Sequence, residues 1–149
     1  MKVLMVCLGN ICRSPLAEGI LKHKVTQQGL DWEIDSAGTG AYHVGELPDV
    51  RSIAVAKKYG IDLTSQRARQ FEVADFDNFD RIYVMDASNY RNVIHLARNE
   101  ADRTKVELIR NVVRPDWNEQ VPDPYWNDNG FEEVFQMLDE ACDYIIKQY

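Results

Sequence analysis

The feature that most constrains the fold is an apolar run near the N-terminus that leads through a short loop into a helix signal. Residues Lys2–Val6 (KVLMV) are almost continuously apolar, which is typical of a strand covered on both faces in a parallel sheet. Ser14 suits the N-cap position of a helix, and Pro15 suits its first turn. The sequence therefore predicts a strand, a loop over residues 7–14 and a helix that ends near Gly29.

Strand and helix signals continue to alternate along the chain. Further strands are predicted at residues 32–36, 81–85 and 106–109, and further helices at 48–59, 88–96 and from 131 onward. We expect Ser88 to cap the helix at 88–96, and Asn129 with Glu132 to form a capping box for the last helix. The alternation favours an α/β fold with one open, four-stranded parallel sheet and helices on both faces. Ligands of such sheets lie beyond the carboxyl ends of the strands, where the first loop is expected.

Length, charge and cysteine content limit the class of protein. A chain of 149 residues with no linker or repeat fits a single domain over residues 1–149. A net charge of −7 disfavours a nucleic-acid or anionic-membrane surface, so any bound anion needs a local pocket. No apolar stretch approaches the roughly 20 residues of a membrane span, and three cysteines make no disulfide framework. We expect a monomer in a reduced, cytoplasmic setting.

The loop VCLGNICRSP carries the residues of an oxyanion site with its own nucleophile. A loop between a strand and a helix N-terminus directs backbone N–H groups into one concavity, where the helix dipole adds positive charge. Gly9 allows a tight backbone path, Asn10 tolerates a left-handed conformation, and Arg13 supplies a planar fork for two phosphate oxygens. Cys7 would face the same N–H groups with the Ser14 hydroxyl as a donor, and such surroundings favour the thiolate. The loop therefore predicts attack by Cys7 on a bound phosphate.

Other nucleotide and metal sites fit the sequence less well. No Gly-Lys pair exists for a Walker A loop, and a dinucleotide-binding loop fails because His43 stands in place of the third glycine. The histidines are too scattered to complete a zinc site. Asp75, Asp77 and Asp80 lack the glycine and glutamate of a calcium loop and are predicted to form a solvated face. We therefore expect no metal and no cofactor.

The segment VPDPYW holds the best candidate for a general acid. If the leaving group is a tyrosine phenolate, whose conjugate acid has a pKa of about 10, a nearby carboxylic acid would speed cleavage by about 10²–10⁴-fold. Asp123 lies between two prolines that stiffen the backbone. Tyr125 and Trp126 follow and can wall a flat ring. An Asp-Pro pair on its own most often marks a turn. The predicted thiolate loop elsewhere in the chain favours the interpretation that Asp123 is a general acid.

Together these motifs resemble the low-molecular-weight protein tyrosine phosphatase family. The resemblance rests on VCLGNICRSP, DPYW and the chain length, and IDSAGTG, RARQ and the C-terminal helix also match the family's layout. It implies a flavodoxin-like, phosphotyrosine phosphatase I-like fold. It also implies metal-independent hydrolysis of protein phosphotyrosine and small aryl phosphates through a phosphocysteine intermediate.

By position in the family's motifs, Cys7 would be the nucleophile, Arg13 the phosphate clamp and Asp123 the general acid and then base. The resemblance implies that Asn10 locks the loop with Ser36, and it suggests a reversible Cys7–Cys12 disulfide. Cys142 is predicted to be a core residue. The full set expected to bind substrate is Leu8, Gly9, Asn10, Ile11, Cys12, Ser14, Tyr42, Tyr125 and Trp126.

Three positions depart from the family's pattern. Tyr42 stands where members often have tryptophan, Gln66 where many have histidine, and Trp126 where some have a second tyrosine. Three other functions compete with the phosphatase: an arsenate reductase on the same scaffold, a phosphotyrosine-binding module whose catalysis has decayed, and a phosphocysteine carrier. The reductase would need further cysteines downstream of the loop, and residues 13–141 contain none. The carrier would need neither Arg13 nor a distant acid.

Overall fold

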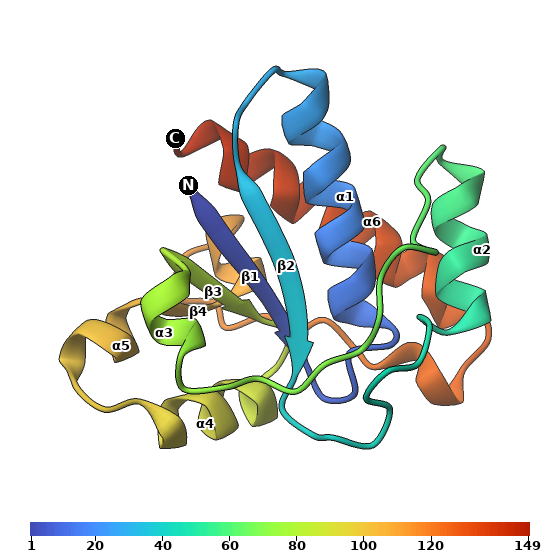
Figure 1. Ribbon diagram of the computed structural model, residues 1–149. Helices are drawn as coiled ribbons and strands as arrows, with labels where there is room; N and C mark the ends of the chain where they lie inside the picture. The colour runs from blue at the N-terminus through green and yellow to red at the C-terminus, as the bar shows by residue number, and fades with distance from the viewer.

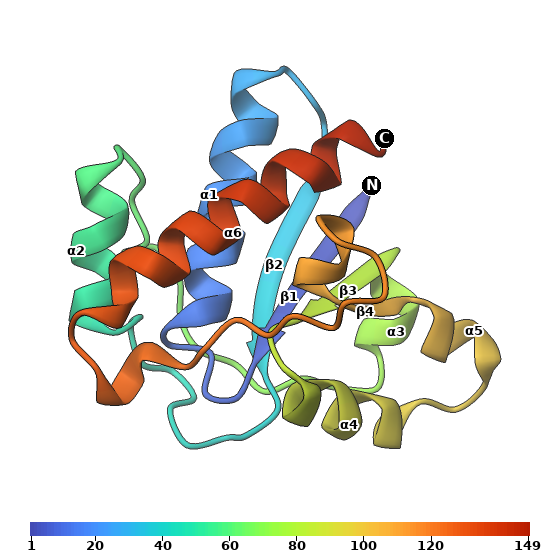
Figure 2. The same ribbon diagram turned by 180° about the vertical axis from the view of Figure 1, so that it is seen from behind.

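The computed structural model describes residues 1–149 and contains one four-stranded, all-parallel sheet in the order β2-β1-β3-β4 (Figure 1). The strands are β1 (Lys2–Cys7), β2 (Glu33–Gly38), β3 (Arg81–Val84) and β4 (Val106–Leu108). The predicted α/β fold and the four predicted strands are therefore confirmed. The chain termini lie at one end of the sheet, and the loop that follows β1 lies at the opposite end, as Figures 1 and 2 show.

Helices cover both faces of the sheet (Figures 1 and 2). The α-helices are α1 (Arg13–Gln27), α2 (Val50–Lys58), α3 (Asp75–Asn78), α4 (Ala87–Leu96), α5 (Glu100–Thr104) and α6 (Gly130–Lys147). Two 3₁₀ helices, η1 (Ile109–Val112) and η2 (Pro124–Trp126), complete the regular structure. None of the helices is long and apolar enough to span a membrane.

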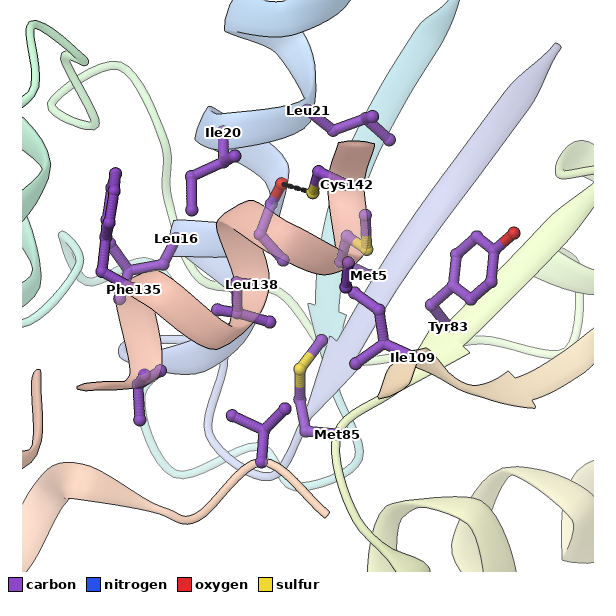
Figure 3. Close-up of a cluster of buried hydrophobic side chains, with 14 of the residues drawn as sticks. Met5, Leu16, Ile20, Leu21, Tyr83, Met85, Ile109, Phe135, Leu138 and Cys142 are labelled. Carbon is purple, nitrogen blue, oxygen red and sulfur yellow. Dashed lines mark hydrogen bonds between the residues drawn. The ribbon is translucent and has the colours of Figure 1, made fainter. Parts of the chain in front are cut away.

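Alternate residues of β1 contribute to two separate cores, because successive side chains of a strand point to opposite faces. Met5 packs in the larger core with α1 and α6, and Figure 3 shows it beside Leu138 and Cys142 of α6. Leu4 and Val6 pack in the smaller core on the other face, with Phe76 of α3. Cys142 is fully buried, as predicted, and burial raises the pKa of its thiol.

Three predicted helix caps are wrong. α1 begins at Arg13 instead of Pro15, since the Ser14 hydroxyl contacts Asn10 and Cys7 instead of capping the helix. α4 is capped by Asp86, whose carboxylate accepts a hydrogen bond from a main-chain N–H in the first turn, and not by Ser88. The predicted capping box of α6 is absent: Asn129 makes no side-chain cap, and the Glu132 carboxylate binds α2.

The sequence patterns also failed for two short segments between strands. Asp75 is buried, not solvated, because its carboxylate forms a two-point ion pair with Arg69 and accepts a hydrogen bond from the Glu72 main chain. α5 was not predicted, since five residues are too few to show a helical period. Asn99 caps it by accepting a hydrogen bond from Asp102 N at 2.9 Å.

Candidate active site

The carboxyl end of β1 opens into a cavity of about 340 Å³. It lies where a parallel sheet is expected to bind its ligand. Its wall is formed by the loop after β1, the loop after β2 and the segment around η2. The lining residues are Cys7, Leu8, Gly9, Ile11, Cys12, Arg13, Tyr42, His43, Asp123, Tyr125 and Trp126.

Ten of the twelve predicted site residues line this cavity. The exceptions are Asn10 and Ser14, which are buried and do not line the cavity. His43 lines the cavity but was not predicted to do so. Its Nδ1 lies 2.9 Å from a Glu46 carboxylate oxygen, and nothing in the local sequence distinguishes it from an ordinary loop histidine.

Asn10 holds the loop from behind in a left-handed conformation, with φ of 57°. Its Nδ2 donates hydrogen bonds to Ser14 Oγ at 2.8 Å and to Ser36 Oγ at 2.9 Å. Its Oδ1 accepts from the Arg69 main-chain N–H at 3.0 Å. Every polar atom of the Asn10 side chain is thus used within the protein, which fixes the shape of the loop before any ligand binds.

These bonds place the Ser14 hydroxyl beside the sulfur of Cys7. Because Ser14 Oγ accepts a hydrogen from Asn10, its own hydrogen is free to be donated, and Cys7 Sγ lies 3.0 Å away. A sulfur that receives a hydrogen bond is stabilised as the thiolate. The Ser14 hydroxyl can therefore donate to a Cys7 thiolate from behind the loop.

The same network ends at a buried carboxylate on α1. Ser36 Oγ donates to Glu18 Oε1 at 2.6 Å, and Lys22 Nζ donates to Glu18 Oε2 at 2.6 Å. Burial raises the pKa of Glu18, although the bonds to Lys22 and Ser36 act in the opposite direction. Gln66 does not join this network. Its Nε2 donates to Pro15 O at 3.1 Å, and its Oε1 is buried without a partner.

Arg13 is buried at the wall of the cavity with its guanidinium held from outside. Its Nη1 donates to Asp86 Oδ2 at 2.7 Å and to Val121 O at 3.0 Å. Burial alone would lower the pKa of Arg13, but the negative charges of Cys7 and Asp86 outweigh it and raise that pKa. The guanidinium is therefore charged and pre-positioned.

Asp123 approaches the same guanidinium from the other side of the cavity. Its Oδ2 lies 3.8 Å from Arg13 Nη2. Its Oδ1 accepts a hydrogen bond from Tyr125 N at 3.0 Å, so Asp123 caps η2, and Pro124 begins that helix. The carboxyl group is thus held by a local turn while one oxygen faces the site.

Gly38, at the end of β2, lets the loop pack directly against the sheet. A Cβ at this position would lie 2.7 Å from Leu8 O and 3.1 Å from Asn10 N, both of them backbone atoms that cannot easily move. The glycine is therefore required by close approach and not by its own backbone angle. In the sequence Gly38 is only one of several residues in a turn-rich segment, so the sequence does not indicate this role.

The two cavity cysteines are expected to differ in reactivity toward iodoacetate. Burial, and then the charge of Asp49, raises the pKa of Cys12 to about 12. Only thiolates react, so at about pH 8 Cys12 should stay unlabelled while Cys7, the predicted nucleophile, is carboxymethylated. Peptide mass spectrometry after brief labelling measures this, with inorganic phosphate as a competitor. Modification of Cys12 at a rate similar to that of Cys7 would contradict the assignment.

Comparison with known proteins agrees with this geometry. The sequence profile of the family described as low molecular weight phosphotyrosine protein phosphatase matches residues 2–149. A low molecular weight phosphotyrosine protein phosphatase of Schizosaccharomyces pombe is 43% identical over 149 residues, covering 97% of this chain and 94% of that protein. A protein tyrosine phosphatase from Entamoeba histolytica, solved with Hepes in its active site, has a TM-score of 0.92 and 36% identity and covers 99% and 96% of the two chains. Drosophila arginine phosphatase has a TM-score of 0.93 and 36% identity, and the match covers 100% of this chain and 98% of that chain.

Proposed function

This chain belongs to the low molecular weight phosphotyrosine protein phosphatase family and is a protein tyrosine phosphatase, a hydrolase, and we propose that Cys7, Arg13 and Asp123 are its catalytic residues. One observation carries this proposal. A thiol in contact with a buried hydroxyl, a buried guanidinium and a carboxyl group from a distant segment line the same cavity.

In the first step, the Cys7 thiolate attacks the phosphorus of the bound ester. The bond between phosphorus and the phenolic oxygen breaks, and that oxygen takes the proton of Asp123. Arg13 binds two of the equatorial oxygens through its planar fork, and the main-chain N–H groups of the loop bind the developing charge. The products are a phosphocysteine and the free phenol.

In the second step, Asp123 acts as a base. It takes a proton from a water molecule whose oxygen attacks the phosphorus, and the bond between sulfur and phosphorus breaks. Inorganic phosphate and the Cys7 thiolate are released. All the groups used are side chains and main-chain amides of this chain, so we propose that the reaction needs no cofactor.

The shape of the cavity supports phosphotyrosine as the substrate. Cys7 is buried at its floor, whereas Tyr42, Tyr125 and Trp126 stand exposed at its rim. A long aryl ester can reach the sulfur between aromatic walls, and a short phosphoserine cannot do so as easily. We propose that the enzyme acts as a monomer, because one chain supplies the whole site, and in the cytoplasm, where a thiol nucleophile stays reduced.

The Asp123→Asn variant tests the acid assignment. We expect kcat/KM for phenyl phosphate to fall by about 10²–10⁴-fold, because phenolate is a strong base that must be protonated as it leaves. The value for para-nitrophenyl phosphate should fall far less, since nitrophenolate leaves without a proton. Initial rates on both esters near the pH optimum measure this. An equal loss on the two esters would mean that another group is the acid.

A further inference from the structure

The first turn of α2 braces the loop that carries the nucleophile. The Asp49 main-chain N–H donates to Ile11 O at 2.8 Å, and Ser52 Oγ donates to Cys12 O at 3.4 Å. Asp49 also caps α2, because its Oδ1 accepts from Arg51 N at 2.8 Å. The start of this helix is therefore attached to the main chain of residues 11–12, next to Arg13.

Arg51 extends from that turn toward the segment that carries the acid. On one side its Nε and Nη2 donate to the two Asp49 carboxylate oxygens, each at 2.9 Å. On the other side its guanidinium lies over the Tyr125 ring, 5.4 Å from the centroid, and over the Phe131 ring at 4.6 Å. Nη1 donates to Asp128. One side chain thus joins the two walls of the cavity.

Within the segment at 123–128, Pro124 is buried and η2 packs against α6, but other side chains of the segment are exposed. The side chains of Trp126 and Asp128 are strongly exposed, and the carboxylate of Asp123 is bonded only to the main chain of its own turn and, more distantly, to Arg13. The stack of the Arg51 guanidinium on Tyr125 and its bond to Asp128 tie this segment to α2. A lysine at position 51 would keep the positive charge, but it could neither donate two parallel hydrogen bonds to Asp49 nor stack on the Tyr125 ring.

We propose that Arg51 is a positioning residue for the general acid, which holds Asp123 at the distance from Cys7 that proton transfer requires. It does not line the cavity, and it acts through Asp49 on one side and through Tyr125 and Asp128 on the other. The proposal rests on the proposed function, because it assumes that Asp123 protonates the leaving group. Small displacements of a proton donor are costly, since about 1 Å can change a rate by about 10²-fold.

The Arg51→Ala variant should lower kcat/KM for phenyl phosphate by about tenfold and that for para-nitrophenyl phosphate by less than about twofold. Arg51→Lys should show a smaller loss on phenyl phosphate. In the Asp123→Asn background, Arg51→Ala should cause no further loss on either ester, because a residue that acts through another has no effect once that residue is gone.

Lys58→Ala is the matched control. Lys58 lies at the other end of α2 and also makes an ion pair, with Glu132 of α6 at 2.6 Å, but the segment at 123–128 is not part of that contact. The Lys58→Ala variant should leave kcat/KM for both esters unchanged. Thermal melting of all variants measures any loss of stability. A uniform loss on both esters, or losses that multiply with Asp123→Asn, would overturn the role of Arg51. If Asp123→Asn itself showed no dependence on the leaving group, the proposed acid would be wrong instead.

Discussion

Replacing Cys7 by serine should lower kcat/KM for a phosphotyrosine peptide by at least about 10⁴-fold, a loss of the size seen when an enzyme loses its nucleophile. The site can stabilise a sulfur anion, because the Ser14 hydroxyl lies 3.0 Å from Sγ and Arg13 holds a positive charge at the wall of the same cavity. A serine hydroxyl is a far weaker acid than a thiol, and the structure places no base beside Cys7 to take its proton. The Cys7→Ser variant should still bind the phosphotyrosine peptide, because the rest of the loop and Arg13 are unchanged.

Turnover of a phosphotyrosine peptide, followed as phosphate release, measures this loss. Phosphoserine and phosphoarginine peptides tested with the unmodified enzyme show whether the aromatic rim selects the substrate as proposed. Cys142→Ala is the control, because it removes a thiol from the fully buried core of α6, away from the cavity. It should lower stability and leave turnover unchanged at 25 °C. A serine variant that kept more than about one hundredth of the activity would rule out the phosphocysteine route.

Replacing Arg13 by lysine should cost about 10³-fold in kcat/KM, although the charge is kept. A lysine ammonium cannot bind two phosphate oxygens side by side while it also donates to Asp86 and Val121 O. The loss should fall on the phosphotyrosine peptide and on para-nitrophenyl phosphate alike, because both esters present the same phosphoryl group. This uniform loss distinguishes Arg13 from Asp123.

Arg110 provides a matched control for this substitution. It is an equally buried arginine whose Nη1 donates to Met137 O at 2.9 Å and pairs with Glu140, while its Nε pairs with Glu119. It does not line the cavity. Arg110→Lys should therefore lower the melting temperature without changing kcat/KM. If Arg13→Lys retained activity within about tenfold, a point charge would suffice, and the planar fork would have no role.

Much of the fold could be predicted because its signals are local. The apolar period of β1, the strand-helix alternation and the apolar stripe of α6 each depend on residues that are close in sequence. Signals that depend on competing partners were unreliable. Ser14 was expected to cap a helix but instead bonds Asn10 and Cys7, and Asp75 was expected in solvent but is paired with Arg69. In each case the polar group is bonded to a side chain four to seven residues away, and no helical or strand period marks that pairing.

The sequence by itself determined the parallel sheet, the loop at its carboxyl edge, and the presence of a thiol and a guanidinium within that loop, because one strand-loop-helix unit contains them all. Only the tertiary structure decided that Asp123 lies 3.8 Å from Arg13 and that Gly38 supports the loop from below. It also decided that Arg51 joins α2 to the acid segment. The physical reason is that such contacts join residues far apart in the chain, so their distances depend on how α2, β2 and α6 pack and not on any local period.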